Sequence, residues 1–182
     1  MNGPQTQNMH PFAAPDWRDR GIAAAFALVA LALYLFRITD PNKLDFDETH
    51  YVPAVRTLMD LAGIANPEHP PLGKWLIGIG MAMAGDEPLG WRVMSALFGS
   101  ALVLSGVMAA RWLLGTRAAA VMTGTLLLLS PMLFIQARIA MLDIFMASFL
   151  MLAFWMMAAG ARAGVWVRPT PVVAGLVLGC AA

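Results

Sequence analysis

The sequence predicts an all-α integral membrane protein, and three observations support this prediction. Hydrophobic residues make up 59% of the 182 residues and charged residues only 13%, whereas a soluble domain carries about 25% charged residues. Several apolar runs approach the ~20 residues that a helix needs to cross a bilayer. Eight of the eleven acidic residues gather instead in one polar stretch, residues 40–90. This composition fits the bilayer as solvent.

The same composition excludes several classes of function. The formal net charge is +1, and no basic cluster with interleaved aromatic residues is available to bind nucleic acid. The single cysteine, Cys180, rules out an internal disulfide framework and a four-cysteine zinc site. No glycine-rich phosphate loop precedes a helix, so soluble nucleotide binding is not supported.

The chain begins with a polar segment, residues 1–17, which predicts a disordered cytoplasmic tail. Arg18 and Arg20 come just before the apolar run, and no small-residue cleavage site follows it, so we expect a retained membrane helix at about 20–38. Further spans are expected at 91–114, at 118–135 and at 141–159, and Ser130-Pro131 is expected to break the second of these near its end. A fifth, at 172–182, has only 11 residues, which indicates the N-terminal part of a longer protein.

An external loop, residues 39–90, separates the first two spans. Apolar residues at helical spacing predict a short helix over 50–62, and Pro70-Pro71 breaks the chain after it. Residues 72–84 are apolar except for Lys74 and are short for a span, so we expect a helix lying at the membrane interface. The alternative is that 72–84 crosses the membrane, which would invert every later helix.

Counts of Lys and Arg in the short loops predict the orientation. With the N-terminus in the cytoplasm, the only arginine in the short external turn is Arg138. The cytoplasmic ends then carry Arg18, Arg20, Arg111, Arg117, Arg162 and Arg168. This orientation places the external loop, Arg138 and Asp143 on one extracytoplasmic face.

Three carboxylates are candidates for chemistry. The side chains of adjacent Asp47 and Glu48 point in different directions, so one can take a proton from an attacking hydroxyl while the other orients a group, binds a metal or caps the next helix. Asp143 lies in the first turn of a predicted span, where a charge is costly unless it faces water or a cavity. A purely structural role is the alternative, as a helix cap for Glu48 and as a partner of the helix dipole for Asp143.

The cations and histidines of the same face complete the candidate set. Arg138 can pair with Asp143 or bind a separate anion, and Arg92 and Lys74 lie at headgroup depth. There they can either snorkel to lipid or hold the phosphate of a lipid-linked substrate. His69, held extended by the following proline, and His50 are candidates for substrate contact, with an ordinary surface histidine as the alternative.

Four blocks in order resemble the protein O-mannosyltransferases, which use polyprenyl- or dolichyl-phosphate-mannose and have the multi-spanning C-type glycosyltransferase fold. The blocks are Phe46-Asp47-Glu48-Thr49-His50-Tyr51, His69-Pro70-Pro71-Leu72-Gly73-Lys74, Gly90-Trp91-Arg92 with Ala96-Leu97-Phe98-Gly99, and Ala137-Arg138-Ile139-Ala140-Met141-Leu142-Asp143. The lipid A aminoarabinose transferases have a similar acidic pair and Pro-Pro-Leu block. His69 and the Gly-Trp-Arg block favour the mannosyltransferases.

The resemblance implies a catalytic role for Asp47, with Glu48 beside it and Asp143 as the second acidic residue of the site. It implies that Arg138 and Arg92 hold the donor phosphate, and Lys74 and His69 match the family's Pro-Pro motif. The family continues through further spans, so residues 18–182 correspond to the N-terminal part of its membrane domain.

The expected function is transfer of a sugar, with mannose the first choice, from a polyprenyl phosphate to Ser or Thr of a protein, with inversion. The expected partners are membrane lipid, the lipid-linked donor and an acceptor protein, but not nucleic acid. A divalent metal is left open, and a bacterial-type inner membrane is the expected location. The alternatives are a transferase acting on a lipid or glycan, a transporter of lipid-linked substrate, and a non-catalytic membrane subunit.

Overall fold

The computed structural model describes residues 13–63 and 65–162. This part of the chain folds into seven α-helices and contains no β-strand. The helices are α1 Trp17–Leu35, α2 Glu48–Met59, α3 Pro71–Ala84, α4 Pro88–Leu114, α5 Arg117–Leu128, α6 Pro131–Gln136 and α7 Asp143–Arg162.

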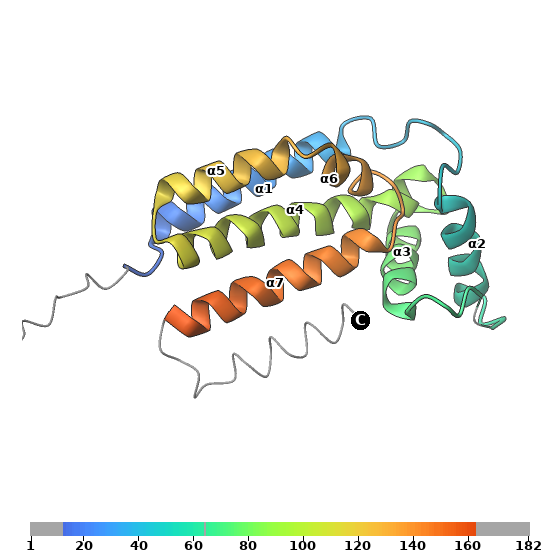
Figure 1. The fold of residues 1–182 in the computed structure, drawn as a ribbon. Coiled ribbons are helices and arrows are strands. Elements are labelled where there is room, and N and C mark those ends of the chain that lie inside the picture. Colours follow the sequence, from blue (N-terminus) through green and yellow to red (C-terminus); the bar gives the residue numbers. More distant parts are fainter. Residues whose placement is uncertain (1–12, 64, 163–182) are drawn as a thin grey trace, which may run out of the picture.

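Helix α4 is the centre of the molecule. It packs against α1, α3, α5 and α7, while α2 packs against α3. The helices α1, α4, α5 and α7 form an elongated bundle, and α2 and α3 stand across one end of it (Figure 1). Small residues let the elements approach closely. A Cβ on Gly99 would lie 2.6 Å from the Cβ of Ala137, so glycine at this position allows the segment after α6 to pack on α4.

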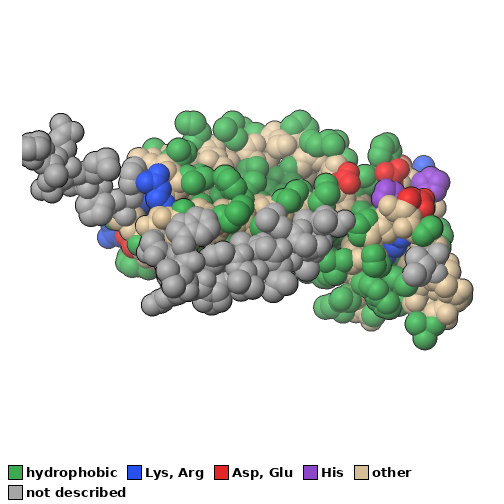
Figure 2. All heavy atoms as spheres, turned by 60° about the horizontal axis from the view of Figure 1, so that its bottom comes forward, with side chains coloured by type: hydrophobic (Ala, Val, Ile, Leu, Met, Phe, Trp, Pro, Cys, Tyr) green, Lys and Arg blue, Asp and Glu red, His purple; other side chains and the backbone are tan. Residues whose placement is uncertain are grey.

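Two of the described helices, α4 and α7, are long and apolar enough to cross a membrane. Large apolar side chains are exposed along the outside of the bundle, among them Leu28 of α1 and Leu126 of α5, which are 65% and 64% exposed. Figure 2 shows the same pattern, because hydrophobic side chains cover the middle of the visible face while charged ones gather toward its two ends. Such a surface suits contact with lipid.

Helix α1 begins at Trp17, three residues before the predicted span of about 20–38, and ends at Leu35. Asp16 caps this helix by accepting hydrogen bonds from the backbone N–H groups of Arg18 and Asp19, and the Asp19 carboxylate accepts one from the backbone of Asp16. This reciprocal cap stabilises the first turn. Residues 13–17 of the predicted tail therefore have a defined structure, whereas residues 1–12 lie outside the described part.

The segment 118–135 forms two helices, with the break where Ser130-Pro131 predicts it. It is divided into α5 and α6 at Leu129 and Ser130, where the Ser130 hydroxyl accepts a hydrogen bond from the Leu133 N–H and Pro131 opens the next helix. Proline disfavours helical geometry at the residue before it, which accounts for the break. The 12 residues of α5 are about 18 Å long and cannot cross a bilayer alone.

The other predicted spans correspond to single helices with shifted ends, α4 for 91–114 and α7 for 141–159. The fifth, 172–182, lies outside the described residues. In residues 39–90, the predicted external loop, the two expected short helices are α2 and α3. The 14 residues of α3 are about 21 Å long, which suits a helix at the membrane surface better than a span.

Candidate functional site

A buried ion pair stands at the centre of the candidate site. Arg92 of α4 donates from Nε to Oε1 and from Nη2 to Oε2 of Glu48, at 2.7 Å in both cases. Neither side chain is more than 1% exposed. This two-pronged geometry is among the strongest that a guanidinium and a carboxylate can form. The first turn of α2 is thereby fixed to the first turns of α4.

The remaining hydrogen-bonding capacity of the pair is also used within the protein. Glu48 accepts from the backbone N–H of Ala140 at 2.8 Å and of Asp45 at 3.0 Å. Arg92 donates to three backbone carbonyls of the loop between α1 and α2, those of Ile38, Pro41 and Lys43. In the structure, Glu48 and Arg92 therefore bind each other and backbone groups of the protein. The sequence suggested instead that Glu48 is a catalytic carboxylate and that Arg92 binds a phosphate.

The Glu48–Arg92 pair and its hydrogen bonds to the backbone form a clamp that brings three distant segments together. It joins the loop before α2, the start of α4 and the segment that leads into α7. Asp47, directly before Glu48, is half-buried, and Asp143, three residues after Ala140, is exposed. Both lie at the end of the bundle where α2 and α7 begin (Figure 1).

Tyr51 shows how closely the carboxylates gather. Burial raises the pKa of its phenol, and the negative charges of Asp47, Asp143 and Glu68 raise it further. An anionic charge acts in this way only when it lies near the titrating group. The side chain of Tyr51 itself is buried, and its ring meets that of His69 edge to face with centroids 5.5 Å apart.

Lys74 on α3 is buried and holds the loop before its own helix. Its ammonium group donates to the carbonyls of Ala65, Asn66 and His69. Burial lowers the pKa of Lys74, and the charge of Glu68 partly offsets this effect. The predicted phosphate contact of Lys74 is thus replaced in the structure by contacts that fix residues 65–69.

Arg138 lies at the C-terminal end of α1. Its guanidinium donates to backbone carbonyls there, those of Leu33, Tyr34, Phe36 and Arg37. Positive charge at a helix C-terminus is favourable. The side chain is half-buried, and burial, with a smaller effect from the charge of Arg92, lowers its pKa. Asp143 accepts a 3.5 Å hydrogen bond from Gln136 rather than an ion pair from Arg138.

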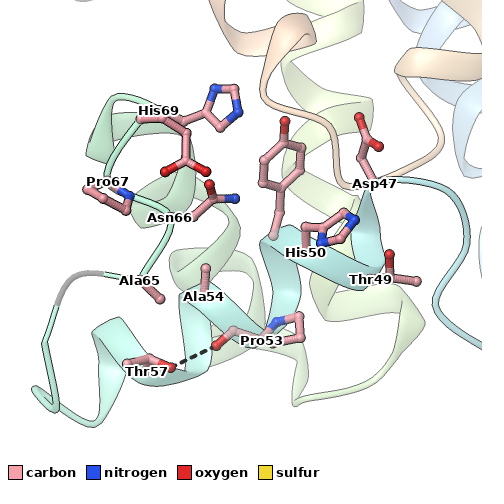
Figure 3. Close-up of a pocket in the computed structure, with 12 residues that line it drawn as sticks. Asp47, Thr49, His50, Pro53, Ala54, Thr57, Ala65, Asn66, Pro67 and His69 are labelled. Carbon is pink, nitrogen blue, oxygen red and sulfur yellow. Dashed lines mark hydrogen bonds between the residues drawn. The ribbon is translucent and has the colours of Figure 1, made fainter.

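A groove of about 740 Å³ lies between α2 and residues 65–69. Figure 3 shows Asp47, Thr49 and His50 at one end, Thr57 at the other, and Asn66 and His69 across from the helix. Of the residues expected at the site, the groove is lined by Asp47, His50 and His69, and Asp143 lies near it. Its lining is Asp47, Thr49, His50, Tyr51, Pro53, Ala54, Thr57, Ala65, Asn66, Pro67, Glu68 and His69.

Sequence reasoning did not assign Tyr51, Glu68 or Thr57 to the site. Tyr51 could have been assigned to the site from the sequence. Asp47, Tyr51 and Ala54 are separated by four and three residues, and this spacing places them on one face of a helix. Glu68 and the loop that carries it had no such signal, because their position depends on the contacts of Lys74.

The structure offers no ready cage for a metal. Within residues 13–63 and 65–162, no group of three or more His, Cys, Asp or Glu side chains is arranged to hold an ion.

Comparison with known proteins adds an independent observation. Residues 68–182 match the family model described as dolichyl-phosphate-mannose-protein mannosyltransferase. The chain is similar to a polyprenol-phosphate-mannose–protein mannosyltransferase of Corynebacterium glutamicum, with 38% identity over 146 residues that cover 74% of this chain. It is similar to proteins of the same description from Mycobacterium tuberculosis, with 35% identity over 144 residues covering 76%, and Mycolicibacterium smegmatis, with 33% over 147 residues covering 78%.

The chain spans a little more than a quarter of each of these relatives, since the matched part is 28% of their length. No solved structure matches it significantly.

Proposed function

Because the chain belongs to the dolichyl-phosphate-mannose-protein mannosyltransferase family, we propose that it carries the catalytic base of an enzyme that transfers mannose from a polyprenyl-phosphate donor to Ser or Thr of a protein. The observation that supports this most directly is the position of Asp47. This carboxylate is half-buried at the end of a groove, directly beside the Glu48–Arg92 clamp that fixes its backbone.

In this mechanism, Asp47 accepts the proton of the acceptor hydroxyl while the hydroxyl oxygen forms a bond to C1 of the sugar. The bond between C1 and the phosphate oxygen breaks on the opposite side, and the phosphate leaves with the electron pair. Inversion follows from this single displacement and needs one base, so the adjacent carboxylate is free for another role. Asp47 lies at the end of the groove, where the hydroxyl of a bound acceptor can come within hydrogen-bond reach of its carboxylate.

Asp143 is proposed as the second acidic residue of the site. It begins α7 and is exposed, and its charge reaches the same phenol as that of Asp47. As an exposed carboxylate whose charge acts on Tyr51 of the groove, it can accept hydrogen bonds from sugar hydroxyls. His50 and His69, both exposed on the groove wall, are proposed as further substrate contacts.

Arg138 is the proposed ligand of the donor phosphate. Of the three cations considered for this role, Arg92 and Lys74 are buried and Arg138 is half-buried. A guanidinium with part of its surface open to solvent can still bind a phosphate oxygen. Arg138 also donates to backbone carbonyls, at the end of α1, so its partial exposure is what distinguishes it. We assign Arg92 and Lys74, with Glu48, to positioning, because they are buried and their donors and acceptors hold backbone groups of the site.

The proposed setting is a bacterial-type inner membrane, with the groove on the extracytoplasmic face and the N-terminus in the cytoplasm. The two long apolar helices α4 and α7 support the membrane location, and the arginines at the ends of α4 and α7 opposite the groove support the orientation. The lipid-linked donor then reaches the site from the membrane, and the acceptor from the aqueous side.

Replacing Asp47 tests the proposal. Full-length Asp47→Asn, assayed with radiolabelled polyprenyl-phosphate-mannose and a threonine peptide, is expected to lose activity by about 10²–10⁴-fold, the usual contribution of a positioned base. Binding of the donor should be retained, since the substitution leaves Arg138 intact. The control is Asp60→Asn, an exposed carboxylate outside the groove. Transfer at the native rate by Asp47→Asn would refute the role of Asp47.

A further inference from the structure

The length of the groove indicates what kind of acceptor it can bind. It follows one face of α2 from Asp47 to Thr57, ten residues of helix and therefore about 15 Å. An extended chain advances about 3.3 Å per residue, so this length accommodates four or five residues of an extended peptide. A single sugar would fill only part of it.

The walls of the groove are polar and acidic rather than cationic. The residues that line it include two carboxylates, Asp47 and Glu68, and no Lys or Arg. The side-chain amide of Asn66 lies against the carboxylate of Glu68, and its nitrogen can donate to that carboxylate once the amide is turned over. Both residues lie on the wall opposite α2. Such a lining repels a phosphate and attracts a positive charge.

The second wall of the groove is built to hold its shape. Lys74 fixes residues 65–69 through three backbone carbonyls, and the ring of His69 packs on Tyr51 of α2. The separation between the walls therefore depends on the buried Lys74 contacts and on the packing of His69 against Tyr51. The groove is preorganised, which lowers the entropic cost of binding a flexible chain.

We propose that this groove binds the acceptor polypeptide in an extended conformation along α2, and that Glu68 makes the enzyme prefer acceptors with a basic residue near the Ser or Thr. The proposal rests on the proposed function, because it places the acceptor hydroxyl at the Asp47 end. The donor phosphate lies outside the groove, where Arg138 is. Acceptors with acidic residues beside the hydroxyl amino acid bind more weakly.

Three synthetic peptides test the preference. They share one threonine and differ only in the flanking residues, which are Lys, Gln or Glu. With the full-length protein and labelled polyprenyl-phosphate-mannose, the KM for the Lys peptide is expected to be about tenfold below that for the Glu peptide, as two partly screened charge contacts imply. Equal KM values for the three peptides would overturn the inference while leaving mannosyl transfer intact. Failure of all three to accept mannose would instead count against the proposed function.

Glu68 variants locate the preference. Glu68→Gln should reduce the ratio of the KM for the Glu peptide to the KM for the Lys peptide by about threefold. Glu68→Lys should reverse the preference, so that the Glu peptide has the lower KM. The matched control is Glu87→Gln, an exposed glutamate outside the groove lining, which should leave the ratio as in the native protein. An unchanged ratio in Glu68→Lys would contradict the assignment, as would an equal change in Glu87→Gln.

A labelling experiment keeps the proposal testable if Glu68 variants do not fold. The only native cysteine, Cys180, is replaced by Ser, and single cysteines are introduced at His50 and Thr57, the two ends of the groove face. In the Asp47→Asn background, the Lys peptide should slow thiol modification at both positions. Protection at His50 without protection at Thr57 would show that the peptide does not follow α2. Protection at both by free mannose would show a glycan site instead.

Discussion

At the scale of single residues, the Glu48–Arg92 pair separates the positioning of the site from its chemistry. A carboxylate that is fully buried and accepts from a guanidinium and two backbone N–H groups cannot approach a substrate without breaking these bonds. Asp47 has the neighbouring position but is only half-buried and lines the groove. The adjacent carboxylates therefore differ in environment, and the difference determines which one is available for proton transfer.

We expect Glu48→Gln and Arg92→Met each to destabilise the protein by about 3–5 kcal/mol, because each leaves one buried charge without its partner. The double variant should cost less than the sum of the single variants, since no unpaired charge is left. Thermal unfolding of the purified full-length protein measures these differences.

The same measurement distinguishes positioning from direct contact with the donor. Loss of transfer in Arg92→Met with an unchanged unfolding temperature would mean that Arg92 binds the donor itself. The control is Arg37→Met, because Arg37 forms only an exposed pair with Asp40, and exposed pairs contribute little to stability.

At the scale of elements, the α2–α3 unit is held to the bundle by polar contacts as well as apolar packing. Arg56 of α2 forms two hydrogen bonds with Asp86, of 2.7 and 2.9 Å, and Asp86 also accepts from the indole of Trp91 on α4. Together with Lys74, these contacts fix both walls of the groove relative to α4. The groove is therefore a property of how α2, α3 and the loop before α3 are tied together.

Lys74→Met tests this dependence. Methionine can fill the buried space of the lysine stem but cannot hold the carbonyls of Ala65, Asn66 and His69, so residues 65–69 should become mobile. We expect the KM for a peptide acceptor to rise by about tenfold, which corresponds to the free energy lost with one hydrogen bond from a charged group. The change in kcat should be smaller. Amide hydrogen exchange should increase in residues 65–69.

The matched control is Lys43→Met, an exposed lysine outside the groove lining. If Lys74→Met lowered the affinity for the donor and left the KM for the acceptor unchanged, Lys74 would be a phosphate ligand after all.

The elements show which features can be predicted from sequence. Apolar runs and proline breaks gave the existence of α1, α3, α4 and α7, because burial in lipid or in a core imposes a pattern on neighbouring residues. The division into α5 and α6 was predicted from Ser130-Pro131, because proline disfavours helical geometry at the residue before it. The cap of α1 was not anticipated, because it depends on Asp16 and Asp19 acting together.

The site was predictable in part for a related reason. Motif residues identify side chains that can do chemistry, and Asp47, Asp143, His50 and His69 indeed meet at one end of the bundle. Arg92 donates to the carbonyls of Ile38, Pro41 and Lys43, which lie about 50 residues away in the chain. Sequence motifs cannot reveal contacts between positions so far apart. Burial of a charge is decided by tertiary structure.

At the scale of the whole molecule, the bundle has a charged cluster at each end. At the end opposite the groove, the buried carboxylate of Asp19 lies 2.9 Å from Nε of Arg117 and 3.1 Å from Nε of Arg111, and Asp16 pairs with Arg117 at 2.7 Å. This network joins the start of α1 to the turn between α4 and α5. The apolar middle of the bundle lies between two polar ends, as a bilayer requires.

The orientation of the bundle can be argued from this arrangement. The positive-inside rule counts Lys and Arg near the ends of spans and gives little weight to Asp and Glu, so the pairing of Arg111 and Arg117 with Asp19 does not remove their signal. The end that carries these arginines is therefore expected in the cytoplasm, and the groove outside.

Single cysteines in a Cys180→Ser background test this orientation in intact cells. A cysteine at exposed Asn42, in the loop before α2, should react with a membrane-impermeant thiol reagent from outside. One at exposed Ala118, in the first turn of α5, should react only after the membrane is permeabilised. The reverse pattern would place the groove in the cytoplasm, where an acceptor crossing the membrane could not reach Asp47 from the aqueous outer side. Equal labelling at both positions would show that residues 88–128 do not separate the two sides, and α4 would then not be a span.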